Sequence, residues 1–225
     1  MYSAVKTVAD TGPGKHARRM TTPPGRGEPQ LALSLSRHRG WHHPRNLPHF
    51  DAKLATQMIT YRLADSLPAE VALRRPNERD TDGQQRYRKR IESALDGGLG
   101  SCCLRMPEIA DEIILTWQHF VPERYRLLAW VVMPNHVHVM ITVLPGWPLA
   151  KIVQSWKSWT GKVITKRQGE LGLASPRGWQ RDYWDRLIRN EEHFCRARDY
   201  IHHNPISAGL CQSPQDWRWS SAVVG

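Results

Sequence analysis

The chain has 225 residues, of which 40% are hydrophobic and 24% are charged, and this is enough apolar material for one domain with a proper core. No apolar run approaches the ~20 residues of a membrane span, and the first residues lack the apolar stretch of a signal peptide. We therefore expect a soluble, cytoplasmic protein that does not enter a membrane. The four cysteines show no CxxC spacing, so we interpret them as free thiols.

The formal net charge of +11 is carried by the two ends of the chain. Residues 1–46 contain 8 Lys and Arg against 2 Asp and Glu, residues 47–150 contain 12 of each kind, and residues 151–225 contain 12 against 7. A basic surface of this kind favours a polyanion, most simply nucleic acid, through the release of counterions. A basic surface that only keeps the protein soluble is the alternative interpretation.

The first folded element is predicted well inside the chain. Residues 1–46 mix Gly, Pro, Ser, His and Arg without a sustained period, which predicts a disordered, basic extension. The domain is therefore expected to cover residues 47–225. Its first strand is predicted at Gln57–Leu63, where side chains alternate between an apolar face and a mixed one.

Helical patterns follow this strand. A helical region opens at Ser66 and Pro68, breaks at Pro76 and at Asp80–Gly83, and resumes over about residues 84–95. A further helix is predicted from apolar residues at i, i+4 and i+8, which are Ile109, Ile113 and Trp117.

A β-hairpin is predicted next. Tyr125–Met133 is one strand, Pro134 and Asn135 form a tight connection, and the run MPNHVHVMI continues into the second strand. Alternation along that strand places His136 and His138 on one face and the intervening valines on the other. Their backbone positions are about 7 Å apart, so the two imidazoles can converge on one metal ion. Two satisfied, half-buried histidines explain the pattern equally well.

The second half of the sheet unit begins after Pro148. An amphipathic helix carries an apolar face from Leu149 to Ile164 opposite several lysines, and a Gly/Pro loop at Gly169–Gly178 leads to an aromatic stretch. A fourth strand is predicted in that stretch, at Trp179–Asp185. The order is then β-α-β-β-α-β, a ferredoxin-like α+β fold with an antiparallel sheet. Helices cover the valine face in this topology, so the histidines are expected on the open face.

The last predicted helix is expected to cover the open face. Asn190 can cap its start and Pro205 is expected to end it. Tyr200, His203 and Asn204 stand at i, i+3 and i+4, so they share a helix face and could project at the histidine pair. The alternative is that Tyr200 is a core aromatic residue with a satisfied hydroxyl.

Several motifs in the right order resemble one family. AWVVMPNHVHVMI, WQRDYWDRLIRNEEHF, DYIHHNPISAGL and WRWSS are similar to segments of the REP-associated tyrosine transposases, single-tyrosine HUH transposases related to those of single-strand insertion sequences. The similarity runs from about Leu47 to Ser221. It implies that Tyr200 is the nucleophile and that His136, His138 and Asn204 hold a divalent cation, Mg²⁺ or Mn²⁺. Better-known relatives often have Gln or Glu at the last position, whereas Asn204 is shorter and precedes Pro205.

The resemblance also implies a reaction and a substrate. The reaction is metal-dependent cleavage and rejoining of single-stranded DNA through a 5′-phosphotyrosine intermediate, beside a hairpin such as a repetitive extragenic palindrome (REP) of the bacterial nucleoid. The chain could act as a monomer or as a homodimer. Single strands suit a basic groove with stacking aromatic residues. We expect DNA contacts from six side chains of the C-terminal half: Lys157, Lys162, Trp159, Arg181, Arg186 and Arg189.

Two other functions fit the same residues. A protein that binds DNA hairpins without cutting them would keep the histidines and Tyr200 for structure alone. A metal-dependent hydrolase would use the HxH pair with water as the nucleophile, and would form no covalent link to DNA. The hydrolase leaves the basic ends of the chain unexplained.

Overall fold

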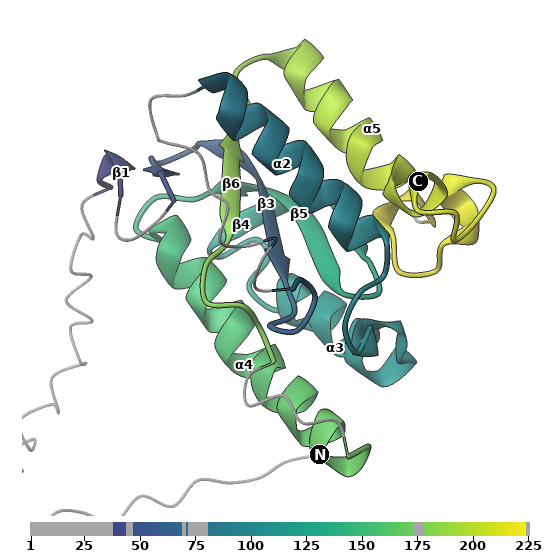
Figure 1. The fold of residues 1–225 in the computed structure, drawn as a ribbon. Helices are drawn as coiled ribbons and strands as arrows, with labels where there is room; N and C mark the ends of the chain where they lie inside the picture. Colours follow the sequence, from purple (N-terminus) through teal and green to yellow (C-terminus); the bar gives the residue numbers. More distant parts are fainter. Residues whose placement is uncertain (1–37, 44–46, 69–70, 72–80, 173–177, 224–225) are drawn as a thin grey trace, which may run out of the picture. The chain divides into compact units, whose positions relative to one another are not determined.

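A four-stranded antiparallel sheet forms the centre of the computed structural model (Figure 1). The structure describes residues 38–43, 47–68, 71, 81–172 and 178–223, all within the compact unit Leu33–Gly225. The sheet order is β4-β5-β3-β6, and every neighbouring pair is antiparallel. Its strands are β3 (Thr56–Arg62), β4 (Tyr125–Val132), β5 (His136–Val143) and β6 (Trp184–Leu187).

Four α-helices pack around this sheet. They are α2 (Thr81–Asp96), α3 (Pro107–Gln118), α4 (Leu149–Glu170) and α5 (Glu191–Ser207). Three short 3₁₀ helices accompany them: η1 (Cys103–Arg105), η2 (Pro214–Asp216) and η3 (Ser221–Val223). The order β3, α2 and α3, β4, β5, α4, β6 is the predicted β-α-β-β-α-β arrangement, and the α+β class is confirmed.

The main core lies between the valine face of the sheet and helices α3 and α4. Val137 and Val139 of β5 pack there with side chains such as Ile113 of α3 and Ile152 of α4. Three buried indoles of this core are paired, because Trp117 donates to the Tyr61 hydroxyl at 2.9 Å, Trp156 to the Tyr125 hydroxyl at 2.8 Å and Trp179 to the Thr160 hydroxyl at 2.9 Å. Packing against α3 and α4 and this pairing stabilise the position of β5.

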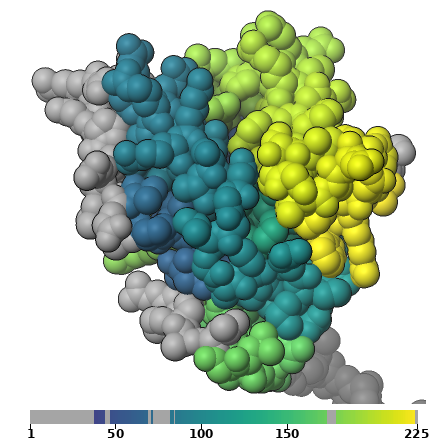
Figure 2. All heavy atoms as spheres, turned by 45° about the vertical axis from the view of Figure 1, so that its right-hand side comes forward, coloured from purple at the N-terminus to yellow at the C-terminus, as the bar shows by residue number. Residues whose placement is uncertain are grey.

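Two helices cover the opposite, histidine face. Ala197 and Ile201 of α5 pack on Met58 and Met140, as expected for the last helix. Helix α2 also lies on this face, where Ile91 and Leu95 form a separate cluster with Leu67 against Trp184 of β6. Figures 1 and 2 show α2 and α5 side by side. The prediction of a single covering helix was therefore incomplete.

A small hairpin precedes the sheet. Strand β1 (Gly40–His42) pairs with β2 (His49–Asp51), so ordered structure begins inside the segment predicted as a disordered extension. The buried Asp185 carboxylate of β6 fixes β2, because it pairs with the His49 imidazole and accepts the N–H of Phe50 at 2.9 Å. Residues 1–37 and 44–46 lie outside the described residues.

Three predicted boundaries differ from the structure. Helix α2 already includes Asp82 and Gly83, which we expected to interrupt it, and Pro76 lies outside the described residues. Strand β6 starts at Trp184 instead of Trp179, because Trp179 is buried under α4 and its indole donates to Thr160. Helix α5 continues to Ser207 with Pro205 inside its last turns. The predicted cap is present, since Asn190 Oδ1 accepts the N–H of His193 at 2.8 Å.

The C-terminal segment runs beside the outer side of β4. Val131 forms an isolated antiparallel bridge with Ser220, and the N–H of Val132 donates to the carbonyl of Trp219 at 2.9 Å. The Trp217 indole returns a hydrogen bond of 2.9 Å to the Val132 carbonyl. The four cysteines are free, as predicted. Among the described helices, none has the length and apolar character needed to cross a membrane.

Candidate active site

The two histidines face each other at the centre of the sheet. In the register of β3 and β5, His138 stands opposite Thr60 and His136 opposite Arg62. Both imidazoles are only 1% exposed, and their Nε2 atoms lie 3.1 Å apart. Alternation along β5 therefore brings both rings to the face that α2 and α5 cover, as the sequence predicted.

The outer nitrogens of both rings are held by polar side chains. His136 Nδ1 lies 2.8 Å from Asn135 Oδ1, and the Asn135 amide nitrogen donates to the carbonyls of Leu95 and Leu99. His136 Nδ1 is therefore the donor, and its Nε2 carries a lone pair. His138 Nδ1 lies 2.7 Å from Thr60 Oγ1, a hydroxyl that can accept a hydrogen bond from this ring.

Burial keeps the imidazoles neutral. It lowers the pKa of His136 to about 3, and the nearby amide of Asn204 opposes this only in part. The pKa of His138 is also held well below its usual range, by burial first and then by His136 and the charge of Arg186. Neutral imidazole is the form that binds a metal ion.

Tyr200 projects from α5 onto this pair. Its ring centroid lies 5.2 Å from that of His138 in an edge-to-face arrangement. Burial raises the pKa of the Tyr200 phenol, and the carboxyl groups of Glu92 and Asp96 raise it further. The charge of Arg186 acts in the opposite direction. Ionisation of the phenol therefore requires a positive charge or a proton acceptor at this place.

Asn204 is the third polar group of the cluster. It lies one helical turn after Tyr200, is 3% exposed, and its Oδ1 atom has no hydrogen-bond partner among the described residues. His203 does not join the cluster, because it is exposed and its Nδ1 contacts the carbonyl of Asp199 at 2.8 Å. The predicted projection of three side chains is correct for Tyr200 and Asn204 and wrong for His203.

These donors fit a single divalent cation. Two ligand atoms at ~2.1 Å from an octahedral ion are about 3 Å apart, close to the 3.1 Å between the Nε2 atoms. The unpartnered oxygen of Asn204 is the kind of buried acceptor that a cation satisfies. The described residues contain no group of three His, Cys, Asp or Glu, so the donor set would be two imidazoles and an amide.

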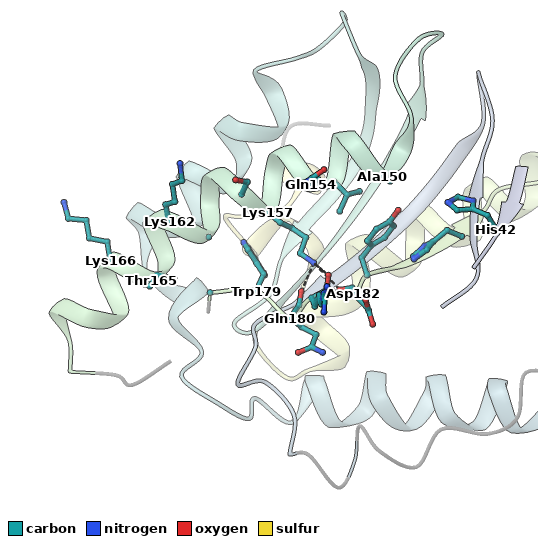
Figure 3. A pocket seen from close by; sticks show the side chains of 17 residues that line it. His42, Ala150, Gln154, Lys157, Lys162, Thr165, Lys166, Trp179, Gln180 and Asp182 are labelled. Carbon is teal, nitrogen blue, oxygen red and sulfur yellow. Dashed lines mark hydrogen bonds between the residues drawn. The ribbon is translucent and has the colours of Figure 1, made fainter. Parts of the chain in front are cut away.

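The residues predicted to bind DNA divide between two places. Lys157, Lys162 and Arg181 line a cavity of about 1050 Å³ between α4 and the segment before β6, which we call the α4 cavity. Figure 3 shows Lys157 pointing at the backbone of this segment, where its Nζ donates to the carbonyls of residues 180, 181 and 182 at 2.6–3.3 Å. Lys157 therefore has a structural role beside any contact with DNA.

The other three predicted contacts lie elsewhere. Arg186 and Arg189 line a separate hollow on the side of α2. Trp159 is 58% exposed but lines neither hollow, and its indole donates to Glu112 at 2.5 Å. Thr60 and Asn135, which orient the histidines, were not predicted. Their roles depend on strand register and on the end of α2, which local sequence patterns do not report.

Comparisons with known proteins give a match to one family model and to several similar proteins. Residues 105–204, which include His136, His138, Tyr200 and Asn204, match the family described as transposase IS200 like. A REP-associated tyrosine transposase of Escherichia coli (strain K12) is 28% identical over 97 residues, 43% of this chain and 54% of that protein. The chain thus spans about half the length of this relative.

Two further similarities are weaker. An uncharacterized protein of Haemophilus influenzae is 25% identical over 123 residues, 46% of this chain and 68% of that protein. A solved structure described as a REP-associated tyrosine transposase bound to a REP hairpin has 20% sequence identity and a TM-score of 0.48, and covers 79% of this chain and 82% of that chain.

Proposed function

We propose that this chain, whose residues 105–204 match the IS200-like transposases, cuts and rejoins single-stranded DNA beside a hairpin. Tyr200 is the proposed nucleophile, and His136, His138 and Asn204 are the proposed ligands of a divalent cation. Mg²⁺ or Mn²⁺ suits the reaction, although imidazole ligands alone would also accept zinc.

One observation carries this proposal. The Tyr200 ring lies 5.2 Å from the His138 ring, and the two Nε2 atoms converge at 3.1 Å beside the unpartnered Asn204 oxygen. A phenol, two neutral imidazoles and an amide oxygen thus meet in one buried cluster. A purely structural cluster would be expected to pair its buried acceptor oxygen.

The protein side chains would act in a defined order. The Tyr200 oxygen attacks the phosphorus atom, a phosphotyrosine bond forms, and the bond from phosphorus to the 3′ oxygen breaks. The phenolic proton is lost to solvent, and the departing oxygen gains a proton to leave a free 3′-OH. The reverse attack by a 3′-OH restores the phenol and rejoins DNA, because one phosphodiester is exchanged for another.

The positions of the two histidines would be fixed by their neighbours. Asn135 holds His136 with its Nε2 lone pair directed inward, and Thr60 can accept the Nδ1 proton of His138 so that its Nε2 does the same. A bound divalent cation would supply Lewis-acid stabilisation of the phosphate. The positive charge of Arg186 near Tyr200 favours the phenolate further.

The α4 cavity is the proposed site for the hairpin itself. Lys162 and Lys166 project from α4 at one end of this cavity, and Arg181 lines it from the segment before β6 (Figure 3). Cations arranged along a helix suit the phosphates of a duplex stem and carry no base sequence information. The REP-type hairpin as substrate rests on the resemblance and on the name of the Escherichia coli relative.

The test is the covalent adduct. A hairpin oligonucleotide with single-stranded flanks, labelled 3′ to the cut, is incubated with Mn²⁺ and analysed by denaturing electrophoresis. Wild type should form a labelled protein–DNA adduct, and Tyr200→Phe should form none while binding the same DNA. Tyr125→Phe is the matched control and should retain the adduct, because the Tyr125 hydroxyl lies in the main core, where it donates to the carbonyl of Trp117.

Other outcomes would select another function. Cleavage by wild type without any adduct would mean that water is the nucleophile and the protein is a hydrolase. Hairpin binding without cleavage under all metal conditions would favour a non-catalytic DNA-binding protein. Full cleavage in EDTA would rule out the assignment of His136 and His138 to a metal ion.

A further inference from the structure

A second groove lies beside α2, on the histidine face of the sheet. Its outer part is a hollow of about 430 Å³, and its inner part is a space of about 20 Å³. The two parts share lining residues on α2 and β6, including Arg88, Trp184 and Arg186. Thr60, whose hydroxyl contacts His138, is one of the residues that line the inner part. We call these two hollows together the α2 groove.

Two arginines line both parts of the α2 groove. Arg88 lies on α2 and Arg186 on β6, where it stands opposite Met58 and therefore on the histidine face. Neither guanidinium makes an ion pair or a hydrogen bond with a described residue. Burial first, and then the charge of Arg186, lower the pKa of Arg88, so the two side chains lie close enough to repel each other. Two guanidinium groups that line one groove, without a partner among the described residues, favour an anion there.

The acidic groups of the groove do not cancel this charge. Asp185 lines both parts, but its carboxylate already pairs with His49 and Phe50 of β2 and with Gln57 of β3. Glu92 lines the inner part, and burial raises the pKa of its carboxyl group although both arginines lower it. The outer part also carries Arg189, so its charge is positive.

Flat aromatic side chains line the outer part. Trp41, which is 58% exposed, Tyr87 and Trp184 lie along it together with the arginines. Alternating guanidinium groups and aromatic faces are the features with which proteins bind single strands, because every base can stack and every nucleotide carries a phosphate. A duplex presents its bases stacked inside and could not use these faces.

We propose that the α2 groove binds the single-stranded DNA next to the hairpin and guides it to Tyr200, with Arg88 and Arg186 on its phosphates. The proposal rests on the proposed function, since it names the path of the substrate to the same site. It assigns the hairpin and the single strand to different surfaces, the α4 cavity and the α2 groove.

The experiment compares three labelled oligonucleotides by fluorescence anisotropy: a hairpin without flanks, the same hairpin with a single-stranded flank, and the flank alone. All proteins carry Tyr200→Phe so that none cleaves. Arg88→Gln and Arg186→Gln should each bind the flanked hairpin and the flank at least about tenfold more weakly, and the bare hairpin within about twofold. Arg196→Gln is the control, because Arg196 is exposed on α5 and paired with Glu192.

The salt dependence gives a second measurement. For the flank alone, the slope of log affinity against log salt should become shallower by about 0.7 for each arginine removed. Arg186→Lys keeps the charge and should keep this slope, and unchanged unfolding temperatures should show that the variants fold.

The result that overturns the inference is distinct from failure of the proposed function. The α2 groove would not be a single-strand site if Arg88→Gln and Arg186→Gln bind all three oligonucleotides as tightly as the parent protein does. The same conclusion would follow if these variants lose as much affinity for the bare hairpin as for the flanked hairpin. Absence of the covalent adduct in wild type would overturn the proposed chemistry, while selective loss of flank binding would still support the groove.

Discussion

At the scale of single residues, Thr60 controls the position of His138. Its hydroxyl is the only described partner of His138 Nδ1, at 2.7 Å, and it comes from the neighbouring strand β3. Outer partners of metal-binding histidines fix the ring and its proton. A side chain that no HxH pattern contains therefore takes part in the proposed metal site.

Thr60→Val should weaken Mn²⁺ binding by about 10–100-fold, because valine fills the same space but cannot accept the Nδ1 proton. Isothermal titration calorimetry would measure the affinity. Thr142→Val is the matched control, since Thr142 bonds to Thr56 on the same pair of strands, away from the histidines. Equal affinities of Thr60→Val and wild type would show that His138 is not a metal ligand.

Lys157 shows how one residue type serves two purposes along α4. Its ammonium holds three backbone carbonyls of the segment before β6, whereas Lys162 is exposed and makes no hydrogen bond with a described residue. The basic face of α4 therefore combines a structural cation with cations that are available to DNA.

Lys157→Met should lower the free energy of unfolding by about 1–3 kcal/mol, because it leaves part-buried carbonyls without a donor. Urea unfolding would measure this loss. Lys162→Met should leave stability unchanged and weaken hairpin binding instead. If Lys157→Met is as stable as wild type, the three carbonyls are satisfied by solvent and the lysine is a DNA contact only.

At the scale of secondary structure, the sequence predicts periodic elements well and their ends poorly. The alternation in β3, β4 and β5 and the apolar spacing of α3 and α4 are each decided by one buried face, so they can be read locally. Strand β6 and the start of α2 are decided by distant partners. Trp179 lies under α4 because its indole donates a hydrogen bond to Thr160, and α2 packs against Trp184 of β6.

The candidate site likewise contains residues that local sequence patterns predict and features that depend on distant elements. His136, His138, Tyr200 and Asn204 fall on predictable faces of a strand and a helix, and the structure brings them together. The α2 groove could not be predicted, because it requires α2 to cross the histidine face beside α5. His203 was misassigned because its ring turns back onto the carbonyl of its own helix.

The ionised carboxyl group of Asp96, at the end of helix α2, lowers the stability of the folded protein. Burial first, and then Glu92, raise the pKa of Asp96 to about 6. The group is half-buried at the last residue of the helix, where the helix dipole also disfavours negative charge. A raised pKa in the folded state means that stability is present at low pH and is lost as pH rises through about 6.

Asp96→Asn should therefore stabilise the protein at pH 7.5 and have little effect at pH 4. A full shift of this size would be worth about 3 kcal/mol, and partial exposure reduces the expected gain to about 1 kcal/mol or less. Chemical unfolding at the two pH values would measure it. An equal gain at both values would indicate a change in helix propensity instead of removal of a charge.

At the scale of the whole molecule, the basic charge can be divided at residue 38, where the described residues begin. Residues 1–37 contain 6 Lys and Arg against 2 Asp and Glu, and β1 begins at Gly40. A deletion through residue 46 would also remove β1. The ring centroid of Trp41 in β1 lies 5.2 Å from that of Phe50 in β2, so this contact would be lost. The structure thus selects residue 37 as the boundary for a test of the extension.

Deletion of residues 1–37 should preserve the thermal unfolding transition and adduct formation but weaken DNA binding. The slope of log affinity against log salt should become shallower, by about 0.9 for each lost contact with a duplex phosphate. Titrations at several salt concentrations would measure the slope. An unchanged slope would mean that this part of the chain does not contact DNA.

The segment from Trp217 to Ser221 has a consequence for the solution behaviour of the protein. Edge strands expose N–H and C=O groups that invite strand addition by another chain, and this is a common route to aggregation. Trp217, Trp219 and Ser220 occupy that position along β4, while the other edge strand, β6, is only four residues long. Proteolytic clipping before Trp217 would uncover the longer edge. The tendency of a preparation to form β-rich aggregates would then report on the integrity of its C-terminus.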